Sequence, residues 1–159
     1  MIDSTTSTDL HTTIMLVTDN RTVLLAMKKR GFGVGKWNGP GGKLEPGESP
    51  LDGAVRECKE EVGITPLNPT ERATLRFELG SLKQTILCHV FLATRCKGTP
   101  VETEEMRPQQ FAFADIPYDT MWQDDIYWLP AVLAGRKLEG TFEFDTNDTL
   151  ISFTVRETQ

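Results

Sequence analysis

Cysteine is scarce in this chain of 159 residues, and no apolar run is long enough to cross a membrane. The three cysteines, Cys58, Cys88 and Cys96, are odd in number and form no close CxxC pair, which favours a reducing, cytoplasmic setting over a disulfide framework. Residues 1–13 are polar and contain neither a basic nor an apolar segment. We therefore expect no signal peptide and no membrane contact.

Positive charge is also in short supply. Lysine and arginine number 17 against 23 aspartates and glutamates, a formal net charge of −6, so we expect no nucleic-acid partner. A small nucleotide is not excluded, because metal ions and a few local cations can hold phosphates. The apolar content of 38% is ordinary for a globular protein. We expect a flexible tail over residues 1–11, then a single domain over residues 12–159 that acts as a monomer.

One amphipathic helix stands out between β-like segments. Ser49 is a good helix cap, Pro50 fits the first turn, Asp52 takes the capping-box position, and Gly63 is a natural left-handed stop. Around this helix the sequence predicts a hairpin (13–18 with 22–27), a glycine-rich loop (31–47), strands (73–79, 85–94 and near 109–113), a helix (125–134) interrupted at Pro130, and a terminal hairpin (141–145 with 150–157). Such a pattern suggests an α/β fold with a mixed sheet between helices.

The central helix carries two faces of different chemistry. The apolar face comprises Leu51, Ala54, Val55, Cys58 and Val62, so Cys58 is interpreted as a small core residue. Glu57, Glu60 and Glu61 share a second face at spacings of three and four residues. Like charges at this spacing destabilise a helix, and a divalent cation would reverse that effect. Oxygen ligands favour Mg²⁺, or Mn²⁺ as the alternative, whereas the simplest competing interpretation is a solvated acidic face.

Residues 42–64 resemble the Nudix box. Gly42 is followed after five residues by Glu48 and, after seven more, by the run Arg-Glu-Cys-Lys-Glu-Glu-Val-Gly-Ile that begins at Arg56. Cys58 is the one soft departure, since an aliphatic residue is usual there. The resemblance implies an α/β/α sandwich and hydrolysis of a nucleoside diphosphate linked to another group.

The same resemblance implies roles for single residues. Glu57, Glu60 and Glu61 would be the metal and base carboxylates, and Gly42 would offer a backbone carbonyl to the metal. Arg56 would orient a box carboxylate, with Glu48 as candidate, although a surface ion pair is the simpler alternative. Outside the box, Glu105 is a further metal candidate, or else a solvated acid in a charged run.

Segments outside the box resemble the oxidised purine nucleoside triphosphatases of animals. They are residues 27–39, 98–102, 105–108 and 121–128, and the likeness runs from about residue 13 to the end of the chain. It implies conversion of 8-oxo-dGTP or 2-hydroxy-dATP to the monophosphate and pyrophosphate, which sanitises the nucleotide pool. The sequence departs from these relatives at Pro40, Gln123 and Ile126 and over residues 79–85, which bears on the choice of oxidised base.

Three polar residues in these segments suit a purine edge. Asn38 offers a carbonyl acceptor and an amide donor. Asp124 and Asp125 are adjacent, and if both are buried they cannot both remain ionised cheaply, so one would act as a donor. We hypothesise that such a pair redistributes a proton and so accepts different oxidised purine tautomers. The competing interpretation is a solvated helix start.

The resemblance also implies apolar pocket walls. Phe32, Met106 and Trp122 would form the walls against which the base stacks, although each is also a reasonable core residue, as Trp37 and Trp128 are expected to be. Thr13 and Lys28 match positions near the substrate, and a solvated lysine is the alternative for Lys28.

Two other functions compete with this one. A broader Nudix enzyme would act on ordinary dNTPs, ADP-ribose or dinucleoside polyphosphates, against which Asn38, Asp124 and Asp125 argue. A non-catalytic nucleotide-sensing module is expected to have lost box carboxylates, and none is lost here.

Overall fold

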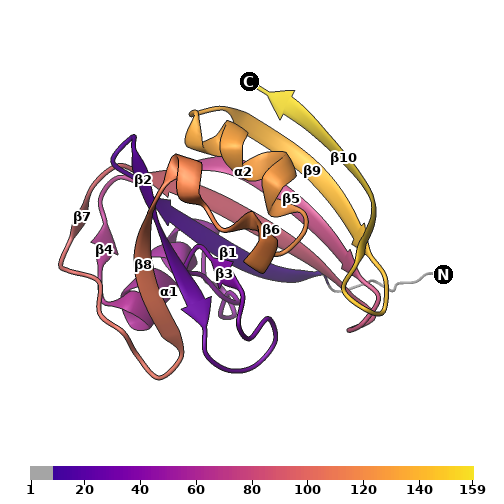
Figure 1. Cartoon of the computed structure of the whole chain (residues 1–159), viewed down its shortest axis with the longest axis horizontal. Helices are drawn as coiled ribbons and strands as arrows, with labels where there is room; N and C mark the ends of the chain where they lie inside the picture. Colours follow the sequence, from indigo (N-terminus) through magenta and orange to yellow (C-terminus); the bar gives the residue numbers. More distant parts are fainter. Residues whose placement is uncertain (1–8) are drawn as a thin grey trace.

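The computed structural model describes residues 9–159 and is built around a five-stranded mixed sheet (Figure 1). The strand order is β1-β6-β5-β9-β10, with β1 parallel to β6, β5 parallel to β9, and the other neighbours antiparallel. These strands are β1 (Leu10–Val17), β5 (Thr70–Leu79), β6 (Gln84–Ala93), β9 (Lys137–Phe144) and β10 (Leu150–Thr158).

Smaller elements complete the fold. A three-stranded sheet has the order β3-β2-β8, with β2 in the centre, and β4 pairs with β7. The bounds are β2 (Thr22–Lys28), β3 (Trp37–Asn38), β4 (Thr65–Pro66), β7 (Cys96–Lys97) and β8 (Met106–Ala112). The helices are α1 (Pro50–Val62) and α2 (Asp125–Leu133), and the short 3₁₀ turns are η1 (Phe113–Asp115) and η2 (Tyr118–Thr120).

The two helices pack on opposite faces of the five-stranded sheet (Figure 1). Alternate side chains of β1 belong to different cores, because successive side chains of a strand point to opposite faces of the sheet. Met15 packs in the core that includes Cys58 of α1, whereas Ile14 packs in the core that includes Trp128 and Leu129 of α2. The predicted α/β/α sandwich is confirmed.

Helix α1 begins and ends where the sequence predicts. The Ser49 side chain accepts a hydrogen bond from the Asp52 backbone N–H (3.1 Å), and Gly63 adopts a left-handed conformation with φ of +79°. Cys58 is fully buried, as predicted, and burial raises the pKa of its thiol to about 12. Leu51 is a correction, since 42% of it is exposed. At that end of the helix Gly53 is the buried residue, and a Cβ on it would lie 2.2 Å from the Leu44 side chain.

The predicted hairpin over residues 13–27 is wrong in its pairing. The turn itself forms, because the Asp19 carboxylate accepts hydrogen bonds from the backbone N–H groups of Arg21 and Thr22, and Thr18 bridges Val23. Beyond that bridge the strands separate: β1 pairs with β6, and β2 pairs with β3 and β8. Residues 14–17 of β1 and 23–26 of β2 are apolar and buried on both faces, so each strand can be buried in its own sheet.

The remaining element predictions are confirmed with small adjustments. Strands β5, β6 and β8, the β9–β10 hairpin, and α2 with Pro130 inside it all lie where expected. The predicted 31–47 loop contains the short strand β3. Residues 10 and 11 belong to β1 and not to a tail, and the tail expected over residues 1–8 lies outside the described residues. Over residues 9–159, neither helix has the length and apolar character to cross a membrane.

Candidate active site

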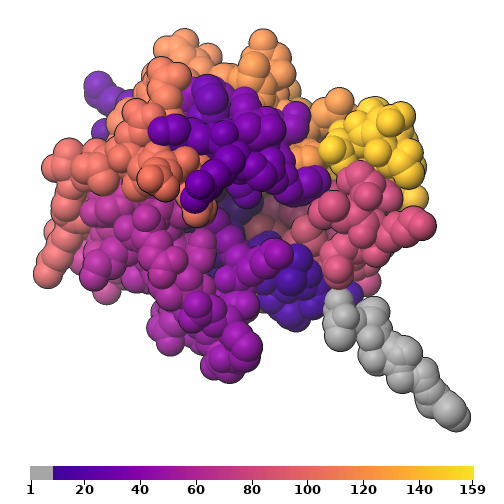
Figure 2. All heavy atoms as spheres, turned by 90° about the horizontal axis from the view of Figure 1, so that it is seen from below, coloured from indigo at the N-terminus to yellow at the C-terminus, as the bar shows by residue number. Residues whose placement is uncertain are grey.

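A cavity of about 190 Å³ lies at one end of the β1–β6–β5 surface, under the loop that joins β2 to β3. We call it the base cavity. Figure 2 shows a hollow between that loop, in purple, and the turn from β5 to β6, in pink. All eight residues that the sequence suggests for substrate binding line it: Thr13, Lys28, Phe32, Asn38, Met106, Trp122, Asp124 and Asp125.

Two adjacent aspartates form one wall of the base cavity. Asp124 and Asp125 are each 2% exposed, so the alternative of a solvated helix start is wrong. Asp124 accepts a hydrogen bond from the Trp128 indole N–H (2.7 Å), whereas Asp125 Oδ2 is buried without a hydrogen-bond partner in the described structure. Burial raises the pKa of Asp124, and burial together with the charge of Asp124 raises that of Asp125 well above its usual value. The pair therefore retains a proton more readily than exposed aspartates do.

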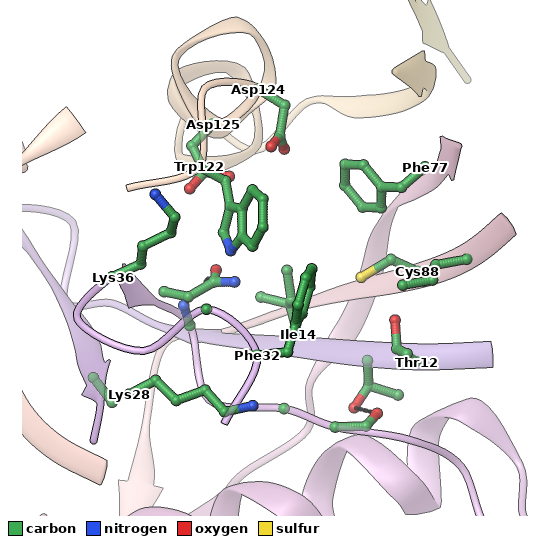
Figure 3. A pocket seen from close by; sticks show the side chains of 18 of the residues that line it. Thr12, Ile14, Lys28, Phe32, Lys36, Phe77, Cys88, Trp122, Asp124 and Asp125 are labelled. Carbon is green, nitrogen blue, oxygen red and sulfur yellow. Dashed lines mark hydrogen bonds between the residues drawn. The ribbon is translucent and has the colours of Figure 1, made fainter. Parts of the chain in front are cut away.

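Aromatic side chains form a second wall. The rings of Phe32 and Trp122 (Figure 3) lie 5.1 Å apart. Phe144 meets Trp122 edge-on at 5.8 Å. Met106 adds an apolar surface from β8. Trp37 and Trp128 are 8% and 1% exposed, so their prediction as core residues is confirmed.

Asn38 lines the base cavity, and its side-chain oxygen already accepts one hydrogen bond. Its side-chain carbonyl oxygen accepts a hydrogen bond from the Gly39 backbone N–H (2.8 Å). The amide NH₂ and the second lone pair of this oxygen are left for a ligand, so Asn38 can still offer a donor and an acceptor.

The sequence did not single out several other lining residues. They are Thr12, Ile14, Lys36, Phe77, Leu79, Ile86, Cys88 and Phe144. Most come from the central sheet, where their apolar character indicates core positions equally well. Thr12 and Ile14 lie on the face of β1 opposite to Thr13, so the prediction of Thr13 gives no signal for them. Cys88 is buried, and burial raises the pKa of its thiol to about 12.

Next to the base cavity lies a surface hollow that we call the acidic face. It is lined by Arg30, Glu57, Glu60, Glu61, Thr103, Glu104 and Glu105. The three box glutamates thus meet Glu105 from the loop before β8, although they are far apart in sequence. Glu105 also pairs with Arg30 at 3.3 Å and is about half exposed, and its role as a metal ligand stays a prediction.

A strip of backbone at Gly41 and Gly42 separates the two hollows. The Gly41 N–H donates to the Glu61 carboxylate (3.0 Å), and the Gly42 carbonyl accepts a hydrogen bond from the Thr13 N–H (2.9 Å). A Cβ on Gly42 would lie 2.2 Å from Glu57 Oε2, which shows how closely this carboxylate approaches the strip. The Thr13 hydroxyl also donates to this carbonyl at 3.5 Å, so Thr13 supplies both of its hydrogen-bond contacts.

Arg56 organises the carboxylates of the box. Its guanidinium donates to both Glu48 oxygens (2.7 and 2.9 Å), to Glu57 (2.7 Å) and to Glu60 (3.2 Å). These hydrogen bonds confirm the expected Arg56–Glu48 contact. Because Arg56 binds three carboxylates, it forms a network and not a single surface ion pair. Hydrogen bonds from Arg56 lower the pKa of Glu48 to about 2.

Glu61 is a box carboxylate with a raised pKa. Burial raises its pKa to about 7, opposed by the hydrogen bond from the Gly41 N–H and by the charge of Lys28. Nearby negative charge from Glu57 and Glu105 acts in the same direction as burial. A cation at this face would offset both the burial and the nearby negative charge, and so would lower the pKa of Glu61.

The acidic face suits a divalent metal ion by its chemistry. Five carboxylates meet one lining arginine, and all the donors are oxygens, the ligands that Mg²⁺ prefers. As the side chains of residues 9–159 are placed, no three acids, histidines or cysteines converge on a single point. Glu57 and Glu60 turn to Arg56, and Glu61 turns to the Gly41 N–H.

A family model described as the NUDIX domain matches residues 9–132, which is most of the chain. The chain belongs to the Nudix family.

Relatives of this Nudix chain cover almost its whole length. It is 44% identical over 151 residues to the oxidized purine nucleoside triphosphate hydrolase of Mus musculus, covering 95% of this chain and 97% of the relative. Identity to the protein of the same description in Danio rerio is 40% over 147 residues, covering 92% and 94%. The crystal structure of a MutT protein from Bacillus halodurans superposes with a TM-score of 0.82 at 29% identity, covering 92% and 97%.

Proposed function

We propose that this Nudix chain hydrolyses oxidised purine nucleoside triphosphates, such as 8-oxo-dGTP and 2-hydroxy-dATP, to the monophosphate and pyrophosphate, and so sanitises the nucleotide pool. One observation carries the proposal. A pair of buried aspartates lies in an apolar cavity of nucleobase size, and that cavity adjoins a face of five carboxylates. The mouse and zebrafish relatives, described as oxidized purine nucleoside triphosphate hydrolases, support the same substrate class.

The base would bind through both walls of the base cavity. Stacking on the Phe32–Trp122 wall contributes about 1–3 kcal/mol per base in comparable sites. Asn38 donates its amide hydrogens, and the Asp124–Asp125 pair accepts or donates according to its proton content. A pair that holds one proton presents an acceptor and a donor together, which suits more than one oxidised purine edge.

The phosphates would extend past the glycine strip to the acidic face. Lys28 lines the base cavity, and its charge acts on Glu61, so it sits where it can approach a phosphate group. Glu57, Glu60, Glu61, Glu105 and the Gly42 carbonyl would hold Mg²⁺, with Mn²⁺ as the alternative, and the Thr13 hydroxyl would then give up its 3.5 Å contact with that carbonyl. When bound, such an ion neutralises phosphate oxygens and makes phosphorus easier to attack.

The protein's own groups would then act on the attacking water. One of the three box glutamates takes its proton, while Arg56 holds Glu57 and Glu60 in place through hydrogen bonds. The Gly41 N–H fixes Glu61 in the same way. Both hollows are formed within one chain, which is consistent with a monomeric enzyme, and a cytoplasmic location would give it access to the nucleotide pool.

A substrate panel tests this proposal. The purified protein with Mg²⁺ is incubated with 8-oxo-dGTP, 2-hydroxy-dATP, dGTP and ADP-ribose, and the products are resolved by chromatography. We expect preferential release of a monophosphate and pyrophosphate from the oxidised purines, and little turnover by the Glu61→Gln control. Turnover confined to dGTP or ADP-ribose would refute the base assignment and keep the chemistry. No turnover with any nucleotide would favour a non-catalytic sensing module.

A further inference from the structure

Lys36 is a lining residue of the base cavity to which no role has yet been given. Its backbone is fixed on both sides, because its N–H donates to the Gly33 carbonyl (3.1 Å) and its carbonyl accepts from the Lys28 N–H (3.1 Å). The side chain is half-buried and lines the base cavity, and Nζ lies 5.1 Å from the centroid of the Trp122 ring. This distance permits a cation–π contact, so the ammonium is held at the aromatic wall.

The same ammonium is directed at the aspartate pair. Figure 3 shows Lys36 reaching toward Asp125 beside Trp122, whereas Lys28, the other lysine of the cavity, lies on the opposite side. Among residues 9–159 Lys36 forms no salt bridge, so it acts on the pair by its field and not by a direct contact.

Within residues 9–159, two further titratable groups face the pair, and neither carries a positive charge. These groups are Tyr118 and Cys88. Burial and the negative charge of the aspartates raise the pKa of each, so both are neutral near pH 7. Within the pair, the charge of Asp124 raises the pKa of Asp125, and Lys36 opposes that rise. Lys36 is thus the cation that favours ionisation of the pair in an otherwise apolar site.

We propose that Lys36 is a specificity-determining residue: held over Trp122 and directed at Asp125, its ammonium sets the proton content of the Asp124–Asp125 pair and thereby the preference among oxidised purines. It is a positioning residue, because it acts through the aspartates. The inference rests on the proposed function for its effect on substrates, but its effect on the aspartates is independent of any substrate.

The expected direction follows from the two base edges. An 8-oxoguanine edge presents two donors, N1–H and the exocyclic amino group, and therefore needs acceptors. A 2-hydroxyadenine edge presents an amino donor beside a ring nitrogen that accepts, and therefore needs one protonated carboxyl. Removing the ammonium favours protonation of the pair, so the preference should shift from 8-oxo-dGTP toward 2-hydroxy-dATP.

The first experiment needs no nucleotide. The indole N–H of Trp128 donates to Asp124, so its NMR resonance follows the protonation of the pair as pH changes. We expect Lys36→Met to move the titration midpoint of this resonance to higher pH, and Lys36→Arg to leave it near that of the parent. Lys137→Met, on the exposed end of β9, is the matched control. An unchanged midpoint in Lys36→Met overturns the inference whether or not the enzyme acts on oxidised purines.

The second experiment measures the ratio of kcat/KM for 8-oxo-dGTP to that for 2-hydroxy-dATP between pH 6 and 9. The ratio cancels titrations of the acidic face that affect both substrates alike. We expect Lys36→Met to lower the ratio about tenfold near pH 7, equivalent to one pH unit in the equilibrium of the pair, with recovery at high pH. A loss that is equal for both substrates at every pH would assign Lys36 a purely structural role. A shifted indole midpoint in a parent enzyme that ignores oxidised purines would refute the proposed function and keep the electrostatic role.

Discussion

Asp125→Asn should make the protein more stable and less active at the same time. Asp125 is 2% exposed, and its Oδ2 has no partner in the described structure, so its ionised form is costly to bury. The substitution keeps the shape of the side chain, removes the charge, and supplies an amide that can donate to Asp124. Leaving a buried polar group unsatisfied costs about 1–3 kcal/mol, and we expect a gain of that size at pH 8.

The sign of the pH dependence follows from the raised pKa of Asp125. Because the folded state holds the proton more tightly than the unfolded chain, the parent has its full stability below the unfolded pKa of about 4 and loses stability as pH rises toward the folded value. The gain from Asp125→Asn should therefore be small near pH 4.5 and largest at pH 8. Activity on 8-oxo-dGTP should fall at least tenfold, because an acceptor for the base is lost.

Urea unfolding at pH 4.5 and pH 8 measures this effect, with Asp119→Asn as the control for loss of one negative charge at an exposed site. We expect the control to change the free energy of unfolding by less than about 0.5 kcal/mol at either pH. Equal stability changes at both pH values, or a destabilised Asp125→Asn at pH 8, would show that burying the ionised Asp125 carboxylate does not destabilise the protein.

Three further predictions concern the acidic face. Glu61→Gln should lower turnover about 100-fold or more without loss of stability at pH 8, since burial raises the pKa of Glu61 to about 7; activity near that of the parent would contradict its assignment. Gly42→Ala should lower kcat about 100-fold by displacing Glu57 while the protein still folds. Gly41→Ala should prevent stable folding in thermal unfolding assays, because its Cβ would lie 1.8 Å from a β1 carbonyl oxygen. Equal stability of the two variants would refute this contrast. Arg56→Lys should weaken Mg²⁺ activation about 10–100-fold because lysine cannot make the same fork of hydrogen bonds, and an unchanged Mg²⁺ titration would count against that role.

The parts of the site that could be predicted from the sequence rest on short-range spacing. Glu57, Glu60 and Glu61 share a face because the helix period dictates it, and Ser49 and Gly63 fix the ends of that helix by capping. The pocket residues were found by resemblance to a family, and the structure brings them to one cavity. Their roles with substrate stay predictions until the substrate panel is measured.

The parts that could not be predicted depend on strand pairing over long distances. The turn at Asp19 is locally correct, yet β1 pairs with β6, more than seventy residues away, and no local signal in β1 reveals that partner. Cys88 lines the cavity for the same reason, because its position opposite Thr12 follows from that register. Lys36 was missed because a single loop lysine usually lies in solvent, and only the placement of Trp122 makes it part of the site.

The glycine strip between the two hollows has a consequence for how new specificities could arise. Gly41 and Gly42 serve as a wall of the base cavity and as a support for Glu57 and Glu61, so a substitution that reshapes this wall also disturbs hydrolysis. Phe77 and Cys88, on the opposite wall, line the base cavity and do not line the acidic face. Recognition of a different damaged base is therefore free to evolve, or to be engineered, from that distal wall while the chemistry stays intact.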